Sequence, residues 1–354
     1  MIKLDKGAKD PLYLQVKAGL LAQINAGAFT PDKPIPTERE LAESLGLSRL
    51  TVRRSIVELA QQGLLRRIPG RGTFIIIGAA KPPITAISLV LAGTEIPYDL
   101  SGPFFMHLLS GLYSTIQPAT LSLRGMATSA EQMRDCQGMV ALWVMDEQKL
   151  RDLAAIGVPL VGYECAPDPA NPLFDNVSHA NEVGSYTAAC SLINLGHRDI
   201  GMVMHPTTVA AERRAGFERA MRQHGLAVPP ERVYNSMATS EAGYAVGRRL
   251  LLDPSKAPTA LLCTDDTIAY GIMAAAQEHG RAVPGFMSII GYGDLGKFTT
   301  PALSSVRMDI AASGREAVRL LRERSANPSL PPRSIILPTE YIRRASCGPP
   351  RADA

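Results

Sequence analysis

Residues 35–74, IPTERELAESLGLSRLTVRRSIVELAQQGLLRRIPGRGTF, decide how the first part of this chain folds. Thr37 and Glu40 have the spacing of a capping box, which predicts a helix that begins after Thr37 and ends at Gly46. Ser48 can cap a second helix that follows almost at once. Apolar residues recur at i, i+4 and i+7 in this second helix and predict its buried face: Val52, Ile56 and Leu59.

A short hairpin is predicted after the two helices. Gly63 ends the second helix, and segments 64–68 and 73–77 can pair across a Pro-Gly-Arg-Gly tip at 69–72. A further helix is expected upstream, over residues 11–27. Helix, tight turn, helix and hairpin in this order are typical of a winged helix-turn-helix, whose second helix enters the major groove of DNA.

The start of the second helix carries residues suited to reading DNA. Arg49 and Arg53 project within about 40° of each other, so both can reach one patch of the groove. An arginine can bind guanine O6 and N7 in a bidentate manner, whereas Ser48 and Thr51 suit phosphate oxygens. The hairpin tip can approach the DNA backbone closely because two of its three residues lack a Cβ: Gly70, Arg71 and Gly72.

Residues 11–74 closely resemble the DNA-binding domain of GntR-family transcription regulators. The matching words, in the family's order and spacing, are PLYLQV, INAG, IPTERELAESLGLSR, TVRRSI and GRGTF. The resemblance implies a DNA-contacting arginine in the ERELA word, which is Arg39 in this sequence. The chain departs from the family at Leu50, where a small polar residue usually stands, so a methyl contact can replace a hydrogen bond there.

The positive charge of the chain is concentrated in its first part. Residues 1–78 contain twelve Lys and Arg against seven Asp and Glu, a net charge of +5, whereas all 354 residues together carry +4. This distribution is the electrostatic footprint of nucleic-acid binding confined to one module. The rest of the chain is close to neutral.

The composition favours an intracellular protein. The first ten residues, MIKLDKGAKD, have no apolar segment of the kind found in signal peptides, and no uninterrupted apolar run reaches the length of a membrane span. The five cysteines are scattered and lack the spacing of a metal site. We therefore expect a reduced, cytoplasmic protein without a membrane partner.

We predict a winged helix-turn-helix domain over 1–78, a linker of small residues and prolines over 79–85, and an α/β domain over 86–347. In this last part apolar strands alternate with helical stretches, which is typical of a parallel sheet. The expected strands are 86–91, 121–124, 138–144, 158–163, 200–204, 260–263 and 287–290. The expected helices are 103–116, 147–156, 179–195, 210–224, 240–252 and 266–279. Two α/β halves in tandem favour a two-lobed clamp with a ligand between them.

The α/β part resembles the effector domain of the LacI family, which is itself similar to periplasmic sugar-binding proteins. The matching words are ISLVLAG, GPFFMHLLSG, GVPLVGYE, DNVSHANEVGSYTAACSLINLGHRDIGMV, AERRAGFERAM, TDDTIAYGIMAAAQEHG, IIGYGDLGKFTTPALSSVRMD and ILPTEYIRRASC. The resemblance implies a first lobe of about 86–165 and 297–325, and a second lobe of about 166–296 and 326–347. A GntR-like head on a LacI-like body resembles arabinose-responsive repressors, in which a sugar in the cleft alters the dimer and releases DNA.

The resemblance also implies effector contacts in the cleft. Arg213, in ERRAGF, stands where the family has a ligand-contacting arginine, and its fork of donors can hold sugar hydroxyls or a carboxylate. Asp265, in TDD, occupies the family's Asn or Asp position and offers two acceptors. The family's usual first acid after the Gly-Tyr word is Gly293 here, which leaves Asp294 one place later as the candidate.

Three further effector contacts are expected from their places along the chain. Trp143, the only tryptophan, ends a strand that faces the cleft and can stack on a ligand, although a place at the edge of the core is an equally open reading. Thr207 lies in the loop before Arg213, and Glu164 ends a strand. The position that often carries an aromatic platform in the family is Ala238.

Enzyme and cofactor patterns fit this chain poorly. Residues 291–296 satisfy GxGxxG after a strand, but no helical pattern follows, so a dinucleotide site is not expected. Asp265 and Asp266 could form a metal pair, yet ligand binding and helix capping are favoured. His197 and His205 are interpreted as structural histidines. We expect no enzymatic activity, no cofactor and no bound metal.

The sequence therefore predicts a sequence-specific, effector-responsive transcription regulator that acts as a repressor. Its expected partners are double-stranded operator DNA, a small effector that is a sugar or a sugar derivative, and a second copy of the chain in a homodimer. The alternative is a solute-binding protein of sugar uptake or sensing, which predicts a signal peptide and no basic head. A regulator fused to an enzyme-like domain would need a cofactor lysine on a longer α/β body.

Overall fold

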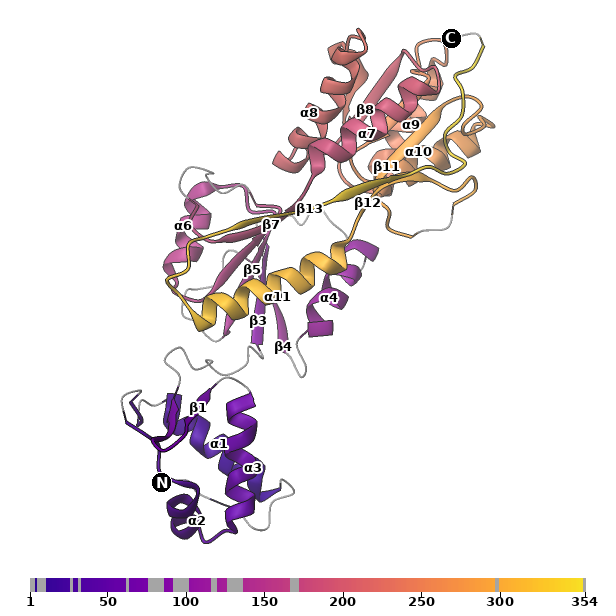
Figure 1. Ribbon diagram of the computed structural model, residues 1–354. Coiled ribbons are helices and arrows are strands. Elements are labelled where there is room, and N and C mark those ends of the chain that lie inside the picture. Colours follow the sequence, from indigo (N-terminus) through magenta and orange to yellow (C-terminus); the bar gives the residue numbers. More distant parts are fainter. Residues whose placement is uncertain are drawn as a thin grey trace. The chain divides into compact units, whose positions relative to one another are not determined.

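The computed structural model describes residues 4, 11–25, 28–30, 33–61, 64–75, 86–91, 102–115, 120–125, 136–165, 172–296 and 299–352. They form a mixed α/β chain with two compact units, one of residues 1–84 and 322–330 and one of residues 85–321 and 331–354 (Figure 1). The linker predicted at 79–85 lies outside the described residues, so its boundaries stay a prediction.

The N-terminal unit is a winged helix-turn-helix, as predicted from the sequence. Three helices precede an antiparallel two-stranded sheet: α1 (Leu12–Asn25), α2 (Glu38–Leu45), α3 (Arg49–Gln61), β1 (Leu65–Ile68) and β2 (Gly72–Ile75). Ile68 lies opposite Gly72 in this sheet, so residues 69–71 form the tip of the wing. Below, this unit is called the head.

Local sequence explains where α2 and α3 begin and end. The Thr37 hydroxyl accepts a hydrogen bond from the Glu40 N–H at 3.2 Å, and the Glu40 carboxylate accepts one from the Thr37 N–H at 2.7 Å, which completes the predicted capping box. Gly46 ends α2 with a φ of +60°, a conformation that glycine adopts readily. The Ser48 hydroxyl accepts from the Thr51 N–H at 3.1 Å at the start of α3. The buried core of the head consists of Val16, Leu20, Ile24, Ile35, Leu41, Ala42, Val52, Ile56, Leu59, Leu64 and Leu65.

The larger unit contains two lobes, each built on a six-stranded sheet. The first-lobe sheet is parallel throughout and has the order β13 (Ser334–Leu337), β7 (Asp175–His179), β6 (Leu160–Tyr163), β5 (Gly138–Leu142), β3 (Ala86–Leu91), β4 (Thr120–Gly125). In Figure 1 this sheet lies beside α4 (Pro103–Thr115), α6 (Glu147–Ala155) and α11 (Ile310–Ala326). Most of its described strand residues are buried, which fits the apolar runs read from the sequence.

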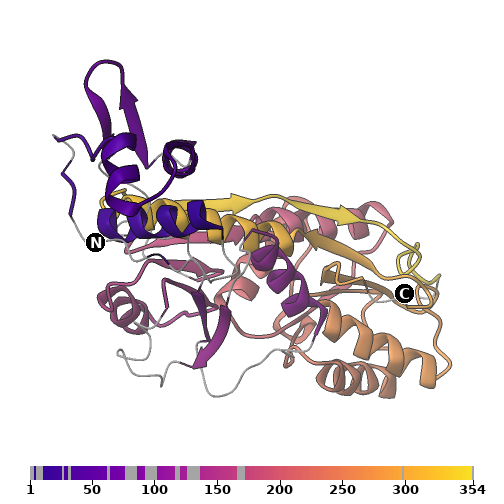
Figure 2. The same ribbon diagram turned by 90° about the horizontal axis from the view of Figure 1, so that it is seen from below.

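The second-lobe sheet has the order β14 (Thr339–Ile342), β12 (Ser304–Met308), β11 (Ser288–Gly293), β10 (Ala260–Cys263), β8 (Ile200–Met204), β9 (Val233–Asn235). Its strands are parallel except for β14, which runs antiparallel to β12. The helices of this lobe are α7 (Asn181–Asn194), α8 (Thr208–Gln223), α9 (Ser240–Leu252) and α10 (Asp266–Glu278), with the short helix η1 (Pro230–Arg232) before β9. Figure 2 shows the two lobes and their sheets from a second direction.

The chain crosses between the lobes at three places, which corrects the predicted lobe boundaries. It crosses after β7, after β12, and between β13 and β14. Strand β7 belongs to the first lobe, although the sequence predicts 166–296 in the second, and β12 belongs to the second, although the sequence predicts 297–325 in the first. Strand β13 likewise lies in the first lobe. Both β7 and β12 are paired on two sides by strands from other parts of the chain, so their position along the sequence is a poor guide to their lobe.

None of the helices among the described residues has the length and apolar character needed to cross a bilayer.

Candidate functional site

The head carries a surface groove between the N-terminus of α2, the start of α3 and the wing. Its volume is about 1140 Å³. Five of the predicted DNA-contacting residues line it: Arg39, Arg49, Gly70, Arg71 and Gly72. Gly72 meets a close neighbour there, because a Cβ added at this position would lie 2.8 Å from the Cβ of Pro34. The groove therefore brings the wing tip and the second helix to one concave surface.

The other predicted DNA contacts lie at the exposed start of α3, beside this groove rather than in it. The Ser48 and Thr51 hydroxyls are 2.8 Å apart and hydrogen-bonded, and Arg53 is exposed one turn further on. Leu50 has 77% of its surface exposed. A leucine so open to water is suited to contact an apolar group of a partner, such as a thymine methyl.

One carboxylate, that of Glu38, links two arginines of the groove. It lies 3.8 Å from Arg49 Nε and 3.8 Å from Arg67 Nη1. Arg39 has a separate partner, Glu43, at 3.6 Å on the next turn of α2. Sequence reasoning missed both Glu38 and Arg67, because ion pairs between an N-terminal helix and the wing leave no local pattern in the sequence.

The larger unit has a cavity at the edge where its two lobes meet. The cavity measures about 30 Å³ within a solvent-connected depression of about 510 Å³. Of the predicted effector contacts, it is lined by Arg213, Asp265, Trp143, Thr207 and Glu164. About two water molecules fit the inner space, so a sugar-sized ligand requires the walls to move apart. The remaining lining residues are Phe104, Tyr163, His205, Val209, Ala210, Ala238, Thr264, Tyr292, Gly293, Leu295 and Met308.

Arg213 is the central cation of the cavity, and each of its three side-chain nitrogens already has a partner. Its Nε donates to Asn181 Oδ1 at 3.0 Å, its Nη1 donates to the Thr264 carbonyl, and its Nη2 contacts Met308 Sδ. The guanidinium carbon lies 3.8 Å from the centre of the Tyr292 ring, which adds a cation–π contact. Only 8% of the residue is exposed. A ligand group that meets Arg213 must therefore replace or extend these contacts.

A glycine on α8 sets the position of this arginine. A Cβ added at Gly216 would lie 2.0 Å from the Glu182 carbonyl oxygen, so only glycine lets α8 pack this closely on α7. Arg213 stands three residues earlier on α8, and Asn181 is the first residue of α7. The close helix contact therefore places the arginine beside its amide partner.

Asp265 and Thr207 line the cavity as helix caps. The Asp265 carboxylate accepts from the Thr267 N–H at 2.7 Å and caps α10, while the Thr207 hydroxyl accepts from the Ala210 N–H at 3.2 Å and caps α8. Burial raises the pKa of Asp265. Helix capping, which the sequence favoured over a metal pair, is thus confirmed for Asp265, and part of its acceptor capacity is left for a ligand.

An aromatic wall closes the cavity on the first-lobe side. The ring centre of Phe104 lies 5.1 Å from that of Trp143 and 6.0 Å from that of Tyr163, and the Trp143 and Tyr163 centres are 6.0 Å apart. Tilted and edge-on rings at these distances form a stable cluster that presents an apolar surface. Trp143 thus faces the cavity rather than the core edge.

Backbone strain marks the edge of the two sheets. Among the described residues, three non-glycine residues have positive φ: Trp143 at 53°, Glu164 at 49° and Asp294 at 53°. Each directly follows a strand, namely β5, β6 and β11, and each was a predicted effector contact. Such conformations persist where the surrounding structure holds them, and they cluster at binding sites.

Glu164 is held by a buried hydrogen-bond network that joins the lobes. Its carboxylate accepts from the His179 N–H at 3.1 Å, lies 2.7 Å from His179 Nδ1, and accepts from Asn181 Nδ2 at 3.1 Å. Asn181 Nδ2 also donates to Glu212 Oε2 at 3.1 Å. Burial, together with the negative charge of Glu164, raises the pKa of Glu212 against the effect of that bond. Glu164 therefore connects the first lobe to the arginine site of the second.

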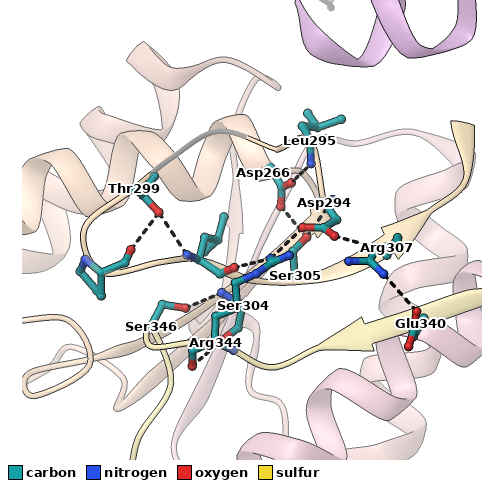
Figure 3. A network of polar contacts seen from close by, with 12 residues as sticks. Asp266, Asp294, Leu295, Thr299, Ser304, Ser305, Arg307, Glu340, Arg344 and Ser346 are labelled. Carbon is teal, nitrogen blue, oxygen red and sulfur yellow. Dashed lines mark hydrogen bonds and ion pairs between the residues drawn. The ribbon is translucent and has the colours of Figure 1, made fainter. Parts of the chain in front are cut away.

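Asp294 lies outside the cavity, contrary to the sequence expectation. Its carboxylate is paired with Arg307 Nε at 2.8 Å and Arg344 Nη1 at 2.7 Å (Figure 3). These ion pairs hold the pKa of Asp294 below its usual value against the effect of burial. Gly293, which has no side chain to offer, lines the cavity instead. Asp294 stands one residue after the position of the family's acid, and this shift directs its carboxylate away from the cavity.

Asp266 belongs to the same polar network as Asp294, to which it is connected through Ser305. One of its oxygens accepts from the Leu295 N–H at 2.8 Å and the other from the Ser305 hydroxyl at 2.7 Å (Figure 3). Burial, together with the neighbouring charges of Asp265 and Asp294, raises the pKa of Asp266 to about 7 against the effect of these two hydrogen bonds. Within the described residues, no group of three or more His, Cys, Asp or Glu side chains could hold a metal ion.

His197 and His205, both interpreted as structural from the sequence, have different surroundings. His197 is buried, and its ring nitrogens lie 2.8 Å from the Thr259 hydroxyl and 2.9 Å from the Gly348 carbonyl, which confirms a structural role. His205 lies on the cavity wall. Burial lowers its pKa, so it faces the cavity as a neutral imidazole at neutral pH.

A winged helix-turn-helix with a basic groove, joined in one chain to a two-lobed α/β unit with a cavity, defines a transcription regulator of the one-component class. Residues 12–75 match the bacterial regulatory proteins of the gntR family, and residues 189–347 match the periplasmic binding protein-like domain. The chain is 30% identical over 336 residues to the arabinose metabolism transcriptional repressor of Geobacillus stearothermophilus. The aligned part covers 88% of this chain and 90% of that protein. The chain belongs to this family of repressors, and it is a regulator rather than an enzyme.

Two further likenesses agree with this assignment. The chain is 30% identical over 261 residues to the ribose operon repressor of Haemophilus influenzae. The aligned part covers 70% of this chain and 78% of that protein. A solved LacI-family regulator from Enterococcus faecium with bound ribose has the same fold, with a TM-score of 0.64 and 22% identity over 75% of this chain and 99% of its own.

Proposed function

We propose that this chain is a homodimeric repressor whose winged heads bind a two-fold operator, and whose operator affinity changes when a sugar or sugar derivative enters the cavity between the lobes. A bacterial regulator that binds operator DNA acts where that DNA lies, so the proposal places the protein in the cytoplasm. The observation that carries the proposal is the interlobe cavity, because both lobes contribute to it and a ligand there touches both.

The chemistry of the cavity supports a sugar-like effector. One wall is aromatic, which suits the apolar face of a sugar ring, and the opposite wall offers donors and acceptors for hydroxyls from Arg213, Thr207 and Asp265. Glu164 and Arg213 reach this space from different lobes. A ligand bound between them would fix the angle between the lobes and so change the separation of the two heads in the dimer.

The size of the effect follows from how strongly the effector distinguishes two states of the dimer. An effector that binds one state tenfold better shifts the equilibrium by about 1.4 kcal/mol. Full induction therefore requires larger discrimination. The closed cavity measures only about 30 Å³, so a sugar-sized effector fits only when its walls have moved apart. Such an effector would distinguish strongly between the closed and the open state.

The sole tryptophan allows a direct test of the cavity. We would titrate the full-length protein with pentoses, hexoses, sugar acids, sugar phosphates, nucleobases and amino acids while following Trp143 fluorescence and the melting temperature. A sugar-like compound should change both signals. Hits found only among nucleobases or amino acids would show that the effector class is wrong.

Two neighbouring arginines provide a matched comparison for the hit compound. Arg213→Lys should weaken its binding at least about tenfold, because a lysine cannot reproduce the fork of donors. Arg214→Lys should leave the binding unchanged, because Arg214 points to the exposed side and pairs with Glu218. Equal binding by both variants would mean that Arg213 is structural only.

Footprinting tests the DNA half of the proposal. Two-fold proteins read two-fold sites, so the protected region should contain two related half-sites about one or more helical turns apart. The hit compound should change the protection. A single unrepeated half-site would contradict the dimeric mode of binding.

A further inference from the structure

The ion pairs of Glu38 have a geometry that differs from an ordinary surface salt bridge. The Glu38 side chain is only 13% exposed, whereas Arg49 and Arg67 on either side of it are 70% and 69% exposed. All three residues line the head groove. A sheltered carboxylate thus lies beneath two cations that extend into the space where DNA is proposed to bind.

Local structure explains why Glu38 stays in this place. It is the first residue of α2, directly after the capping residue Thr37, and a carboxylate is favoured there by the partial positive charge of a helix N-terminus. With so little of its side chain exposed, Glu38 has little access to a base edge itself. Its influence on DNA passes through the two arginines.

The distances leave the arginines able to bind. At 3.8 Å, Arg49 Nε and Arg67 Nη1 are attracted to Glu38 but lie beyond hydrogen-bonding distance from it. The N–H groups therefore remain available for phosphate oxygens or for guanine O6 and N7. Charge attraction restricts where each guanidinium lies without occupying its donors.

We propose that Glu38 is a positioning residue for DNA reading, which holds Arg49 in the orientation that reads a base, and that Arg67 is a further DNA contact contributed by the wing. This inference rests on the proposed operator binding. A long arginine side chain loses rotamer freedom when it docks, and a fixed carboxylate reduces that loss by restricting the side chain beforehand. Without Glu38, Arg49 turns towards the nearest phosphate, which carries no sequence information.

The strand that carries Arg67 contains its own control. Arg66 and Arg67 are adjacent in β1 and both are exposed, but side chains alternate between the two faces of a strand. Arg67 lines the groove, and Arg66 is not among its lining residues. Replacing each by alanine removes the same charge from the same strand, on opposite faces.

The test uses full-length protein and duplexes that the wild type selects from a randomised 20-base-pair library, with unselected random duplex as the nonspecific competitor. We would measure the affinity for both DNAs over a series of salt concentrations, for the wild type and for Glu38→Gln, Arg67→Ala, Arg66→Ala and Glu58→Gln. Glu58→Gln is the charge-matched control, because Glu58 pairs with Lys17 and Arg54 and does not line the groove. Melting temperatures establish that each variant is folded.

Glu38→Gln should lower the ratio of selected to random affinity about tenfold, mainly through weaker binding of the selected duplex, because one oriented arginine contact is lost. Random DNA should be bound at least as tightly, since a negative charge has been removed from the groove. Glu58→Gln should leave the ratio within about twofold. In an Arg49→Ala background the effect of Glu38→Gln on the ratio should disappear, because Glu38 acts through Arg49 and no arginine is left there to position.

Arg67→Ala should reduce the slope of log affinity against log salt by about 0.9 for each head, and Arg66→Ala by less than half as much. An unchanged ratio in Glu38→Gln, or the same fall of the ratio with and without Arg49, would overturn the positioning role. An unchanged salt slope in Arg67→Ala would overturn the additional contact. If the wild type itself selects no sequence from the library, the proposed operator binding fails, which is a different result from either of these.

Discussion

Arg49 in the head and Arg213 in the interlobe cavity illustrate opposite ways of preparing an arginine for a partner. Arg49 has 70% of its side chain exposed and lies 3.8 Å from a single carboxylate, so its donors are available. Arg213 is buried, donates to an amide and a carbonyl, and covers the Tyr292 ring. The head can therefore bind DNA much as it stands, whereas the cavity must rearrange to accept an effector.

This difference separates recognition from regulation. Substituting an exposed arginine should change what is bound and leave folding intact, whereas substituting the buried one should affect both.

Arg213→Ala should lower the free energy of unfolding of the larger unit by about 3–5 kcal/mol, because it leaves buried acceptors on Asn181 and Thr264 without their charged donor. Thermal and denaturant unfolding measure this loss. Arg214→Ala, the exposed neighbour, should change stability by no more than about 0.5 kcal/mol. Similar losses for the two variants would mean that the burial of Arg213 has no energetic consequence.

Arg49→Ala should weaken operator binding by about 1–3 kcal/mol and relax the preference at one base pair, because the bidentate base contact is lost. Stability should stay within about 0.5 kcal/mol of the wild type. Arg71→Ala should lower affinity for all sequences and reduce the salt slope instead. Competition binding with single-base operator variants distinguishes the two patterns, and identical patterns would contradict the assigned roles.

Asp266 is a buried acid, and it can be compared with an exposed acid in the same way as the two arginines. Its pKa is raised from 3.8 to about 7 in the folded protein. The folded state therefore holds a proton that the unfolded state has released between these values, so the contribution of Asp266 to stability falls as the pH rises from about 4 to about 7. Asp266→Asn removes this dependence. Between pH 5 and pH 8 the variant should gain more than about 1 kcal/mol relative to the wild type in denaturant unfolding.

The exposed acid Glu218 provides the control for that measurement. Glu218→Gln should show no such gain over the same range, since Glu218 is more exposed and pairs with Arg214 on the surface. A parallel shift of both variants with pH would show that the buried position of Asp266 is not the cause.

Leu50→Thr should have the smallest effect. Leu50 is 77% exposed on α3, so the free energy of unfolding should change by less than about 0.5 kcal/mol. The base preference at one operator position should nevertheless change, because a hydroxyl replaces a methyl surface. Selection from a randomised library checks this, and an unchanged consensus would mean that Leu50 faces no base.

The head could be predicted from sequence almost completely because its signals are local. The capping box of Thr37 and Glu40, the stop at Gly46 and the spacing of Val52, Ile56 and Leu59 each act within a few residues. Asp265 is a further example, because the N–H group that its carboxylate caps belongs to Thr267, only two residues later. Local hydrogen bonds leave a readable pattern.

The features that sequence analysis missed depend on residues far apart in the chain. Strand β7 reads DNVSH, a short and partly polar segment, and it becomes a strand because β6 and β13 pair with it on either side. Asp294 is directed away from the cavity by Arg307 and Arg344, which follow 13 and 50 residues later. The contact between Glu38 and Arg67 joins a helix to the wing.

The three crossings between the lobes have a mechanical consequence. They lie side by side, because the Ala180 N–H donates to the Leu337 carbonyl at 2.9 Å and Met308 pairs with Thr339 in the next strand. We expect three adjacent connections to resist twisting and sliding of one lobe against the other, and to bend together about one axis. An effector in the cavity then needs to set a single angle, and a motion with one degree of freedom can be passed along the chain without being lost in many small adjustments.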